Sequence, residues 1–477
     1  MQALLALLPC AVVIAAVLGF GWSGLAAAGA SLAATLALAM ISAFNQPATW
    51  MFGHAALDAL LLTGLVAATL VPGVFFIEAT RRLKSPEAIA RVVSALKLPV
   101  PQAAILISLG LGLLVESLTG MGVSLLLTVP LLVALLPRSA AIAVALVGMS
   151  LMPWGALALA GTLGATLANI EPSRFGLAIW RASGPVAAVL PLVATWIAGG
   201  RRARDFLIAF VCGAVLWAAT GAATWALGMT LAGVASGLAL LALLALKAER
   251  SPELAQSLRD PALSPYAVLI AAVTIQTLAV PLLAKYQLSP RISTDRVSFA
   301  LLTSPGVALM LATVLSASRS LDADLLRTIT QRSWRAVLSV GLFMLTARLL
   351  VSAGAIDALT NQIKGYGAFG ALAAVTGLGA IGGFVTGSGV TGNALFLPSA
   401  AAAGTAMGAK DLFSAICSAA AGHTAMASLP VAALLLTALP NRTAADDRTT
   451  LRWGLALAAG YLCILIATGW MQFWLTA

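Results

Sequence analysis

The 477-residue sequence has very few charged side chains. Only 9% of its residues are Asp, Glu, Lys or Arg, whereas 61% are hydrophobic and the mean hydropathy is +1.02. A soluble domain carries roughly 25% charged residues, and no polar stretch here is long enough to form one. Apolar stretches of about 20 residues, the length that a helix needs to cross a bilayer, recur from end to end. The composition predicts one all-α polytopic domain, 1–477, embedded in the lipid bilayer.

The residues of conventional catalysis and metal binding are scarce as well. The chain has two histidines and four cysteines, and the cysteines lie far apart in apolar runs, so we interpret them as packing residues. The sequence contains no phosphate-binding glycine loop with Lys, no Cys/His ligand cluster and no plausible Ser-His-Asp set. We therefore expect neither an enzyme nor a cofactor or metal site.

Positive charge predominates, with a formal net charge of +11. Lys and Arg lie mainly in short loops between apolar segments, where they orient a membrane protein by remaining in the cytoplasm. This placement argues against nucleic acid as a partner. If the basic loop at 81–97 is cytoplasmic, alternation puts most of the 27 basic residues inside. The same alternation puts both termini outside the cytoplasm. The protein could also form a homodimer, which the sequence does not decide.

Ten segments have the length and hydropathy of single crossings. With two irregular stretches, at 99–170 and 367–437, which each make a net single crossing, they predict about 12 crossing segments. The ten lie at 4–20, 24–43, 55–77, 177–198, 206–227, 231–246, 266–284, 299–316, 336–356 and 451–474.

Each irregular stretch contains a glycine-rich break between two apolar arms, followed by an interrupted helix. The arms are short for full spans, so we predict two re-entrant helical hairpins, each followed by a broken crossing helix. A pair of full spans has the same parity and stays open as an alternative. The segments lie at 99–115, 123–136 and 140–169 in the first stretch and at 368–385, 394–407 and 412–437 in the second.

The two breaks correspond residue by residue. Thr-Gly-Met-Gly-Val-Ser at 119–124 matches Thr-Gly-Ser-Gly-Val-Thr at 386–391, and Gly-Met-Ser at 148–150 matches Gly-His-Thr at 422–424. The charge-based topology has the two hairpins enter from opposite sides. Shared order, similar spacing and opposite orientation predict an inverted-topology repeat, a common plan of secondary transporters. Ordinary glycine-mediated helix packing is the alternative.

Unwound backbone at membrane depth persists only where it is buried in protein or lines a wet cavity. A half-helix that starts at Val123 or Ala394 would point its unpaired N–H groups and positive dipole end at the break, which favours a carboxylate. We therefore predict that the two breaks together bind a small organic anion. The candidate binding residues are Thr119, Gly120, Gly122, Ser124, Thr386, Gly387, Ser388, Gly389, Thr391, Asn393 and Arg348.

Several ionisable side chains lie in or beside apolar runs. Glu116 precedes the first break, where a charged carboxylate is costly, so it either carries a coupling proton or braces the unwound backbone. His423 either joins in proton coupling or packs as a neutral hydrogen-bonded ring. Arg348, inside a span, either pairs with the substrate, turns outward or pairs with an acid. His54 and Asp58, one helical turn apart, are interpreted as a local pair.

Two segments resemble the bacterial L-lactate permease family. Residues 116–122, Glu-Ser-Leu-Thr-Gly-Met-Gly, are similar to its Glu-Gly-Ala-Ala-Gly-Phe-Gly stretch. Residues 384–396, Phe-Val-Thr-Gly-Ser-Gly-Val-Thr-Gly-Asn-Ala-Leu-Phe, resemble its Phe-Leu-Thr-Gly-Ser-Asp/Asn-Thr-x-Ser-Asn-x-Leu-Phe signature, and 303–306 is also similar. The resemblance implies an ion-transporter-type fold. It also implies proton-coupled symport of L-lactate, glycolate or a similar 2-hydroxy monocarboxylate across the bacterial cytoplasmic (inner) membrane.

Several positions depart from the family pattern. Gly389, Val390 and Gly392 replace three polar residues, and the family's Lys in the following helix falls near Ala425, so we expect a divergent member. Sodium-coupled transport or exchange of another small anion, such as a di- or tricarboxylate, an inorganic anion or a sulfonate, is the alternative. An anion channel is the remote one. The positions that keep the family residue are Glu116, Gly120, Gly122, Thr386, Gly387, Ser388 and Asn393.

Overall fold

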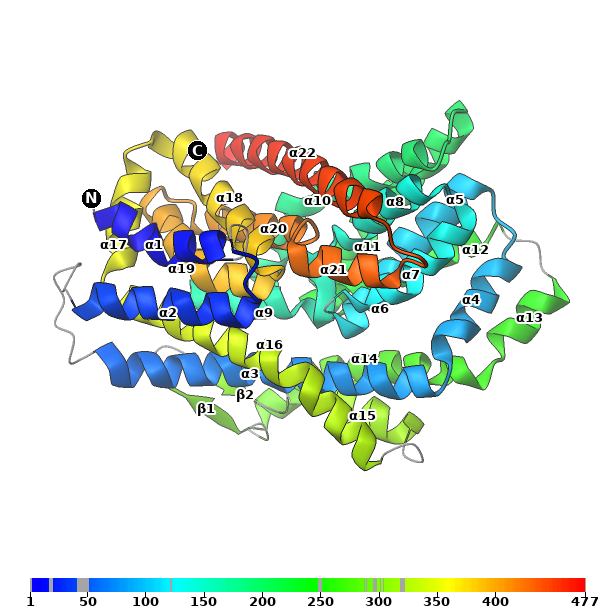
Figure 1. Cartoon of the computed structure of the whole chain (residues 1–477), viewed down its shortest axis with the longest axis horizontal. Coiled ribbons are helices and arrows are strands. Elements are labelled where there is room, and N and C mark those ends of the chain that lie inside the picture. The colour runs from blue at the N-terminus through cyan, green and yellow to red at the C-terminus, as the bar shows by residue number, and fades with distance from the viewer. Residues whose placement is uncertain are drawn as a thin grey trace.

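A computed structural model describes residues 2–16, 20–40, 51–120, 122–247, 251–286, 288, 290–294, 298–300, 302, 304–317 and 322–476. Almost all of them are helical (Figure 1). Within this part of the chain nine helices are long and apolar enough to cross a bilayer, or up to ten if a bent pair, Arg138–Met149 and Met152–Ala168, counts as one span. The chain is thus an all-α multi-pass membrane protein, as its composition predicts; the number of about 12 crossings stays a prediction.

The bounds of the elements follow the apolar segments of the sequence. The helices before the first break are α1 (Gln2–Ile14), α2 (Gly24–Met40), α3 (Met51–Arg82), α4 (Ser85–Ala95), α5 (Val100–Ile105), the π-helical η3 (Leu106–Leu111) and α6 (Gly112–Thr119). Between the breaks lie α7 (Val123–Leu135), α8 (Arg138–Met149), η4 (Met152–Trp154), α9 (Gly155–Ala168), α10 (Pro172–Ile197), α11 (Ala203–Leu227), α12 (Met229–Ala245), α13 (Pro252–Leu258), η5 (Pro261–Leu263), α14 (Ser264–Lys285), α15 (Pro305–Ala317), α16 (Ala323–Ser352), α17 (Ala355–Lys364) and α18 (Gly367–Thr386). After the second break come α19 (Gly389–Ala406), α20 (Lys410–Ala425), α21 (Leu429–Ala438) and α22 (Ala444–Thr476).

The segment predicted as a helix at 299–316 begins with a strand. Residues Ser298–Ala300 form β2, which pairs antiparallel with β1 (Arg291–Ser293), and the helix α15 starts only at Pro305. Proline suits the first turn of a helix, because its fixed φ matches the helix and its missing N–H has no partner there anyway. The prediction placed the start of this helix too early because hydropathy alone does not mark the turn before Pro305.

Helices α2, α3 and α16 form one face of the molecule and run along its long axis (Figure 1). α3 packs against α16 and α15. The approach to α15 is very close, because a Cβ added to Gly306 would fall 1.6 Å from the carbonyl oxygen of Ala68. This face supplies one wall of the cavity between the breaks.

The two irregular stretches pack in the same way internally. In each, the hairpin arms contact one another and the helix that follows them: α6, α7 and α8 in the first, and α18, α19 and α20 in the second. The contact is glycine-mediated in both. A Cβ on Gly148 would lie 2.6 Å from the carbonyl oxygen of Ser108, and a Cβ on Gly383 would lie 1.9 Å from that of Ala421. Small residues permit this close approach of helix backbones.

The packing between the two stretches is reciprocal. The second hairpin arm of the first stretch, α7, contacts α21, which is the last half-helix of the second. The second arm of the second stretch, α19, contacts α9, which is the last half-helix of the first. Each hairpin therefore contacts the broken helix of the other stretch; Gly120 and Gly122 of the first break are buried, and the second break is partly buried.

Figure 1 places the two chain termini toward the same end of the long axis and the C-terminal end of α3, with Arg81 and Arg82, toward the opposite end. Arg138 at the start of α8 pairs there with Asp446 of α22, with 2.7 Å between the guanidinium Nε and the carboxylate. The orientation drawn from the charge count stays a prediction.

Candidate functional site: a cavity between two broken helices

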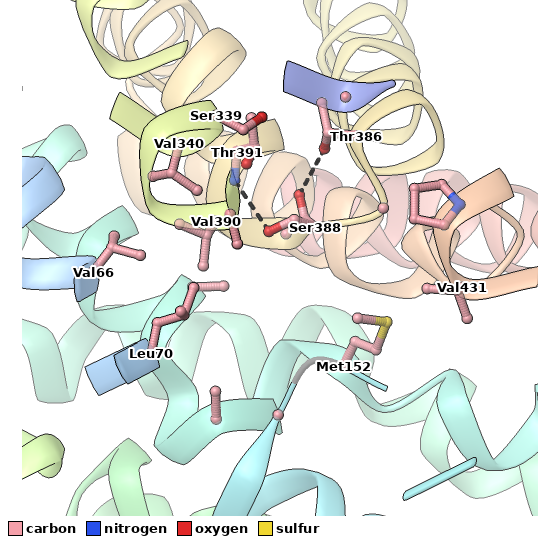
Figure 2. A pocket seen from close by; sticks show the side chains of 18 of the residues that line it. Val66, Leu70, Met152, Ser339, Val340, Thr386, Ser388, Val390, Thr391 and Val431 are labelled. Atoms are coloured by element: carbon pink, nitrogen blue, oxygen red, sulfur yellow. Dashed lines mark hydrogen bonds between the residues drawn. The ribbon is translucent and has the colours of Figure 1, made fainter. Parts of the chain in front are cut away.

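A cavity of about 550 Å³ lies between the two breaks. Its wall includes residues of both glycine-hydroxyl segments, which are far apart in the sequence. Residues of α1, α2, α3, η4, α9, α15, α16 and α21 also contribute to the wall, and Figure 2 shows several of their side chains. The sequence-predicted site residues that line it are Glu116, Thr119, Gly120, Thr386, Gly387, Ser388, Gly389 and Thr391.

The first break, which we call the first tip, comprises Gly120 to Gly122. α6 ends at Thr119, and Gly120 and Gly122 have φ angles of 72° and 75°. An L-residue with a side chain rarely adopts such positive φ, so glycine is required at both turns. α7 then begins at Val123. The start of α7 agrees with the half-helix predicted from the sequence, whereas the first arm runs four residues past its predicted end at Val115.

Glu116 is folded over this first tip. Its Oε1 accepts a hydrogen bond from the backbone N–H of Gly122 at 3.1 Å, and its Oε2 accepts one from the Ser124 hydroxyl at 2.9 Å. The side chain is almost fully buried, yet it contributes to the cavity wall, whereas Gly122 and Ser124 do not. The carboxylate of Glu116 thus occupies the donors that the sequence predicted for a substrate. This geometry supports the interpretation of Glu116 as a brace.

The second break, which we call the second tip, comprises Gly387 and Ser388. α18 ends at Thr386, Gly387 has a φ of 68°, and α19 begins at Gly389 rather than at Ala394 as predicted. The difference has a local cause. Ser388 is the N-cap, and its hydroxyl accepts a hydrogen bond from the backbone N–H of Thr391 at 3.4 Å. Serine is among the preferred N-cap residues, and it allows the helix to start five residues earlier.

The early start of α19 leaves backbone donors at the cavity. The first four N–H groups of an α-helix have no partner within the helix. Here the Ser388 hydroxyl satisfies that of Thr391, and the first intrahelical bond runs from Gly392 N–H to the Ser388 carbonyl. The N–H groups of Gly389 and Val390 remain, and both residues line the cavity. The Thr386 hydroxyl donates to the Ser388 carbonyl at 3.1 Å and fixes the turn (Figure 2).

Each tip also packs on the start of a half-helix from its own stretch. A Cβ on Gly120 would fall 2.5 Å from the Cβ of Ala156 in α9, and a Cβ on Gly387 would fall 2.8 Å from the hydroxyl of Ser428, just before α21. The two tips therefore meet the other broken elements in the same manner, and a side chain at either glycine would separate them.

The electrostatics of the cavity are simple. Among the described residues that line it, Glu116 is the one charged side chain, and no Lys, Arg or His takes part. The remaining polarity comes from backbone groups and hydroxyls. Over the described part of the chain, no group of three His, Cys, Asp or Glu is placed to hold a metal ion.

Two predicted site residues lie behind the cavity wall. Asn393 is fully buried one turn inside α19, and its amide donates to the Ala160 carbonyl of α9 at 2.8 Å and to the Ser418 hydroxyl of α20 at 2.9 Å. His423 is fully buried and places Nδ1 2.5 Å from the Ser150 carbonyl oxygen. Both side chains join the two broken helices to one another and do not contribute to the cavity wall.

Arg348 lies apart from the cavity as well. Its guanidinium is 2.5 Å from the carboxylate of Asp58, and both side chains are buried. The second carboxylate oxygen of Asp58 accepts a hydrogen bond from the Thr294 hydroxyl at 2.5 Å. Of the alternatives left by the sequence, the structure shows pairing with an acid. Among the described residues no ion pair joins His54 to Asp58, and the partners of Asp58 come from other parts of the chain.

Sequence reasoning missed most of the cavity wall outside the two tips. Ser339 of α16 and Thr69 of α3 supply hydroxyls, and Val66, Leu70 and Met152 supply apolar surface. A single hydroxyl in an apolar helix gives no signal of its own, because helices in membranes use Ser and Thr for packing too. Only the fold brings these residues to the breaks.

Comparison with known proteins bears on this site directly. Residues 288–440 match the model of the L-lactate permease family. The match is consistent with membership of that family and confirms the resemblance drawn from residues 384–396. It covers about a third of the chain and includes the whole second tip, while the first tip lies outside it. No curated protein matches the sequence.

Proposed function

We propose that the protein is a secondary active transporter that couples the uptake of a small organic monocarboxylate, such as L-lactate or glycolate, to protons. The single observation that carries this proposal is the cavity between the two tips, whose described wall has one ionisable side chain, Glu116, and no fixed positive charge. The match to the L-lactate permease family supports lactate as the first substrate to test.

The substrate carboxylate belongs at the second tip. There the N–H groups of Gly389 and Val390 and the positive end of the α19 dipole face the cavity. The hydroxyls of Ser388 and Thr391 lie at the same place (Figure 2). Such donors hold an anion without the cost of burying a cation.

Proton coupling follows from the charge of the first tip. A substrate anion and an ionised Glu116 in one cavity repel each other; two unit charges within about 8 Å do so by about 2 kcal/mol at an effective dielectric constant of 20. Protonation of Glu116 removes this repulsion. One proton then accompanies one monocarboxylate, and the loaded cavity carries the same net charge as the empty one.

The reciprocal contacts of α7 with α21 and of α9 with α19 support an inverted-topology repeat. In this arrangement the two hairpins enter the membrane from opposite sides, and each opens the cavity to one side when it moves against the other stretch. The first arm at Val100–Thr119 is long enough to cross, but 94% of its most apolar stretch is buried inside the protein. Burial of this kind supports a re-entrant arm enclosed by other helices.

The test is uptake of labelled L-lactate into proteoliposomes. We expect accumulation above the medium concentration when the lumen is alkaline relative to the outside, and no accumulation when only a sodium gradient is imposed. Accumulation driven by sodium alone would replace proton coupling with the sodium alternative. Uncoupled current would point to a channel, and the absence of any carboxylate flux would reject the proposal.

The orientation in the membrane is part of the same proposal. We place the protein in the bacterial cytoplasmic (inner) membrane with both termini outside, because the basic loops then lie in the cytoplasm. Reporter fusions at either terminus, active only outside or only inside the cytoplasm, test this orientation. A homodimer stays a prediction, which the mass of the purified protein in detergent tests.

A further inference from the structure

The cavity between the tips has a polar side and an apolar side. In Figure 2 the hydroxyl-bearing residues Ser339, Thr386, Ser388 and Thr391 gather at the α19 end. Val66, Leu70 and Met152 lie on the other side of the cavity, while Val340 and Val390 lie among the hydroxyls. Most of the further lining side chains are aliphatic or aromatic, including Leu118, Leu159, Leu309, Phe343 and Leu434, and the polar ones among them include Glu116 and Thr119 at the first tip and Thr69 on α3.

The volume of the cavity exceeds that of a three-carbon hydroxy acid. Six non-hydrogen atoms, each given at most the ~30 Å³ share of a water molecule in the liquid, fill less than about 180 Å³. The cavity measures about 550 Å³, within the range of about 300–1,000 Å³ that is typical of sites for larger small molecules. A lactate held at the second tip would leave most of the apolar side in contact with water.

The far side of the cavity also lacks a partner for a second anionic group. Its described lining contains no Lys, Arg or His, and the one charged side chain, Glu116, is acidic. A dicarboxylate or tricarboxylate would place its second charge among aliphatic side chains, where an unpaired charge is strongly disfavoured. The lining therefore favours a ligand with one carboxylate and an apolar body.

We propose that the protein binds and carries monocarboxylates with a branched aliphatic or aromatic side chain more tightly than lactate. This inference rests on the proposed function and names the substrate class of the same site. The carboxylate occupies the donors of the second tip, and the side chain fills the space among Val66, Leu70 and Met152. Each methylene removed from water should tighten binding about fourfold, which corresponds to about 0.8 kcal/mol.

The experiment is competition against labelled L-lactate uptake in proteoliposomes containing the full chain. The competitors form a series of increasing side-chain size: lactate, 2-hydroxyisovalerate, 2-hydroxyisocaproate and 3-phenyllactate, with malate as the dicarboxylate control. We expect inhibition constants to fall by at least tenfold from lactate to 2-hydroxyisocaproate, and malate to compete poorly. Constants that stay level or rise with size, or strong competition by malate, would overturn the inference.

Substitutions in the apolar wall of the cavity test whether the preference for larger acids arises there. Leu70→Trp fills the apolar side and should raise the inhibition constant of 2-hydroxyisocaproate much more than that of lactate, and Val66→Phe on the same side should do the same. Leu60→Trp is the matched control on the same helix, because this side chain is 67% exposed and lies outside the cavity. Direct counterflow of labelled 2-hydroxyisocaproate distinguishes a transported substrate from a blocker, and a mere blocker would contradict the proposal that it is carried.

The two proposals can fail separately. Lactate uptake under a pH gradient with no advantage for larger acids would leave the proposed function intact and reject the inference. The absence of flux for every acid in the series would reject both.

Discussion

The two tips have nearly the same sequence but present opposite chemistry to the cavity. At the first tip, Glu116 accepts hydrogen bonds from Gly122 and Ser124, so a carboxylate of the protein already occupies the donors. At the second tip the position that corresponds to Glu116 is Gly383, which packs against the α20 backbone, and Gly389 and Val390, whose N–H groups have no partner within α19, line the cavity. One tip carries its own anion, and the other has room for an anion from outside.

Under the proposed function, this difference gives the two tips two roles. The glycines that make the turn are common to both tips, because positive φ is needed wherever the chain reverses so tightly. The residue one helical turn before the first glycine, Glu116 in the first tip and Gly383 in the second, determines whether the donors of the tip are already occupied. An acid there closes the tip and supplies a group that can carry a proton, whereas a glycine there leaves the donors free.

The largest effect should come from removing the acid of the first tip. Glu116→Gln should abolish accumulation of lactate driven by a pH gradient, by about 100-fold or more, because the site can no longer gain or lose a proton. Exchange of internal for external lactate should continue, since the neutral amide mimics the protonated carboxyl. Uptake and counterflow in the same proteoliposomes check this, with Glu253→Gln, an exposed acid, as the charge-matched control. Undiminished accumulation in Glu116→Gln would remove the proposed distinction between the tips.

Both tips should depend equally on their turn glycines. Gly120→Ala and Gly387→Ala each force a side chain into positive φ and into contact at 2.5 and 2.8 Å, so each should reduce uptake by more than about tenfold. Gly377→Ala in α18 is the control, because an added Cβ there meets nothing within 4 Å. Initial rates per amount of folded transporter test this. Normal uptake by either tip variant would show that this tip is not part of the site.

The second tip should hold the anion without help from Arg348. Arg348→Met leaves Asp58 buried without its partner and should destabilise the protein by about 3–5 kcal/mol. The double variant Arg348→Met/Asp58→Leu removes both charges and should restore thermal stability and lactate uptake together. Thermal unfolding in detergent and uptake assays follow the two properties. A double variant that is stable but does not bind lactate would make Arg348 the counter-ion of the substrate after all.

The smallest effect should come from the N-cap of the second tip. Ser388→Ala removes the hydroxyl that accepts from the Thr391 N–H, a loss of about 1 kcal/mol for a typical cap. We expect the apparent KM for lactate to rise about fivefold while Ser388→Thr keeps most of the affinity. Thr405→Ala, near the other end of α19, serves as the control. An equal rise in both alanine variants would indicate general weakening of α19 instead of a local role.

Much of the fold and part of the site could be predicted from the sequence. Hydropathy gives the apolar helices because their length must match the bilayer, and paired glycines mark the breaks because little else tolerates their backbone angles. The predicted start of α7 at Val123 agrees with the structure to the residue, and the first arm ends four residues later than predicted. The start of α19 does not, because the capping power of Ser388 outweighs the polar appearance of residues 389–393. The sequence predicts Asn393 and His423 as site residues because they are polar and close to the breaks. In the folded helices, however, their side chains point toward neighbouring helices and hydrogen-bond to them.

The sequence by itself determined that the chain is a helical membrane protein and where its backbone must break, since both follow from local rules of hydropathy and backbone conformation. Tertiary structure decided which groups meet. The fold places the two tips, 267 residues apart in the sequence, at one cavity. It also pairs Arg348 with Asp58, 290 residues away. The rest of the cavity wall comes from helices whose sequences give no sign of a binding site. Contacts of this kind depend on how helices pack in three dimensions, which a single sequence does not record.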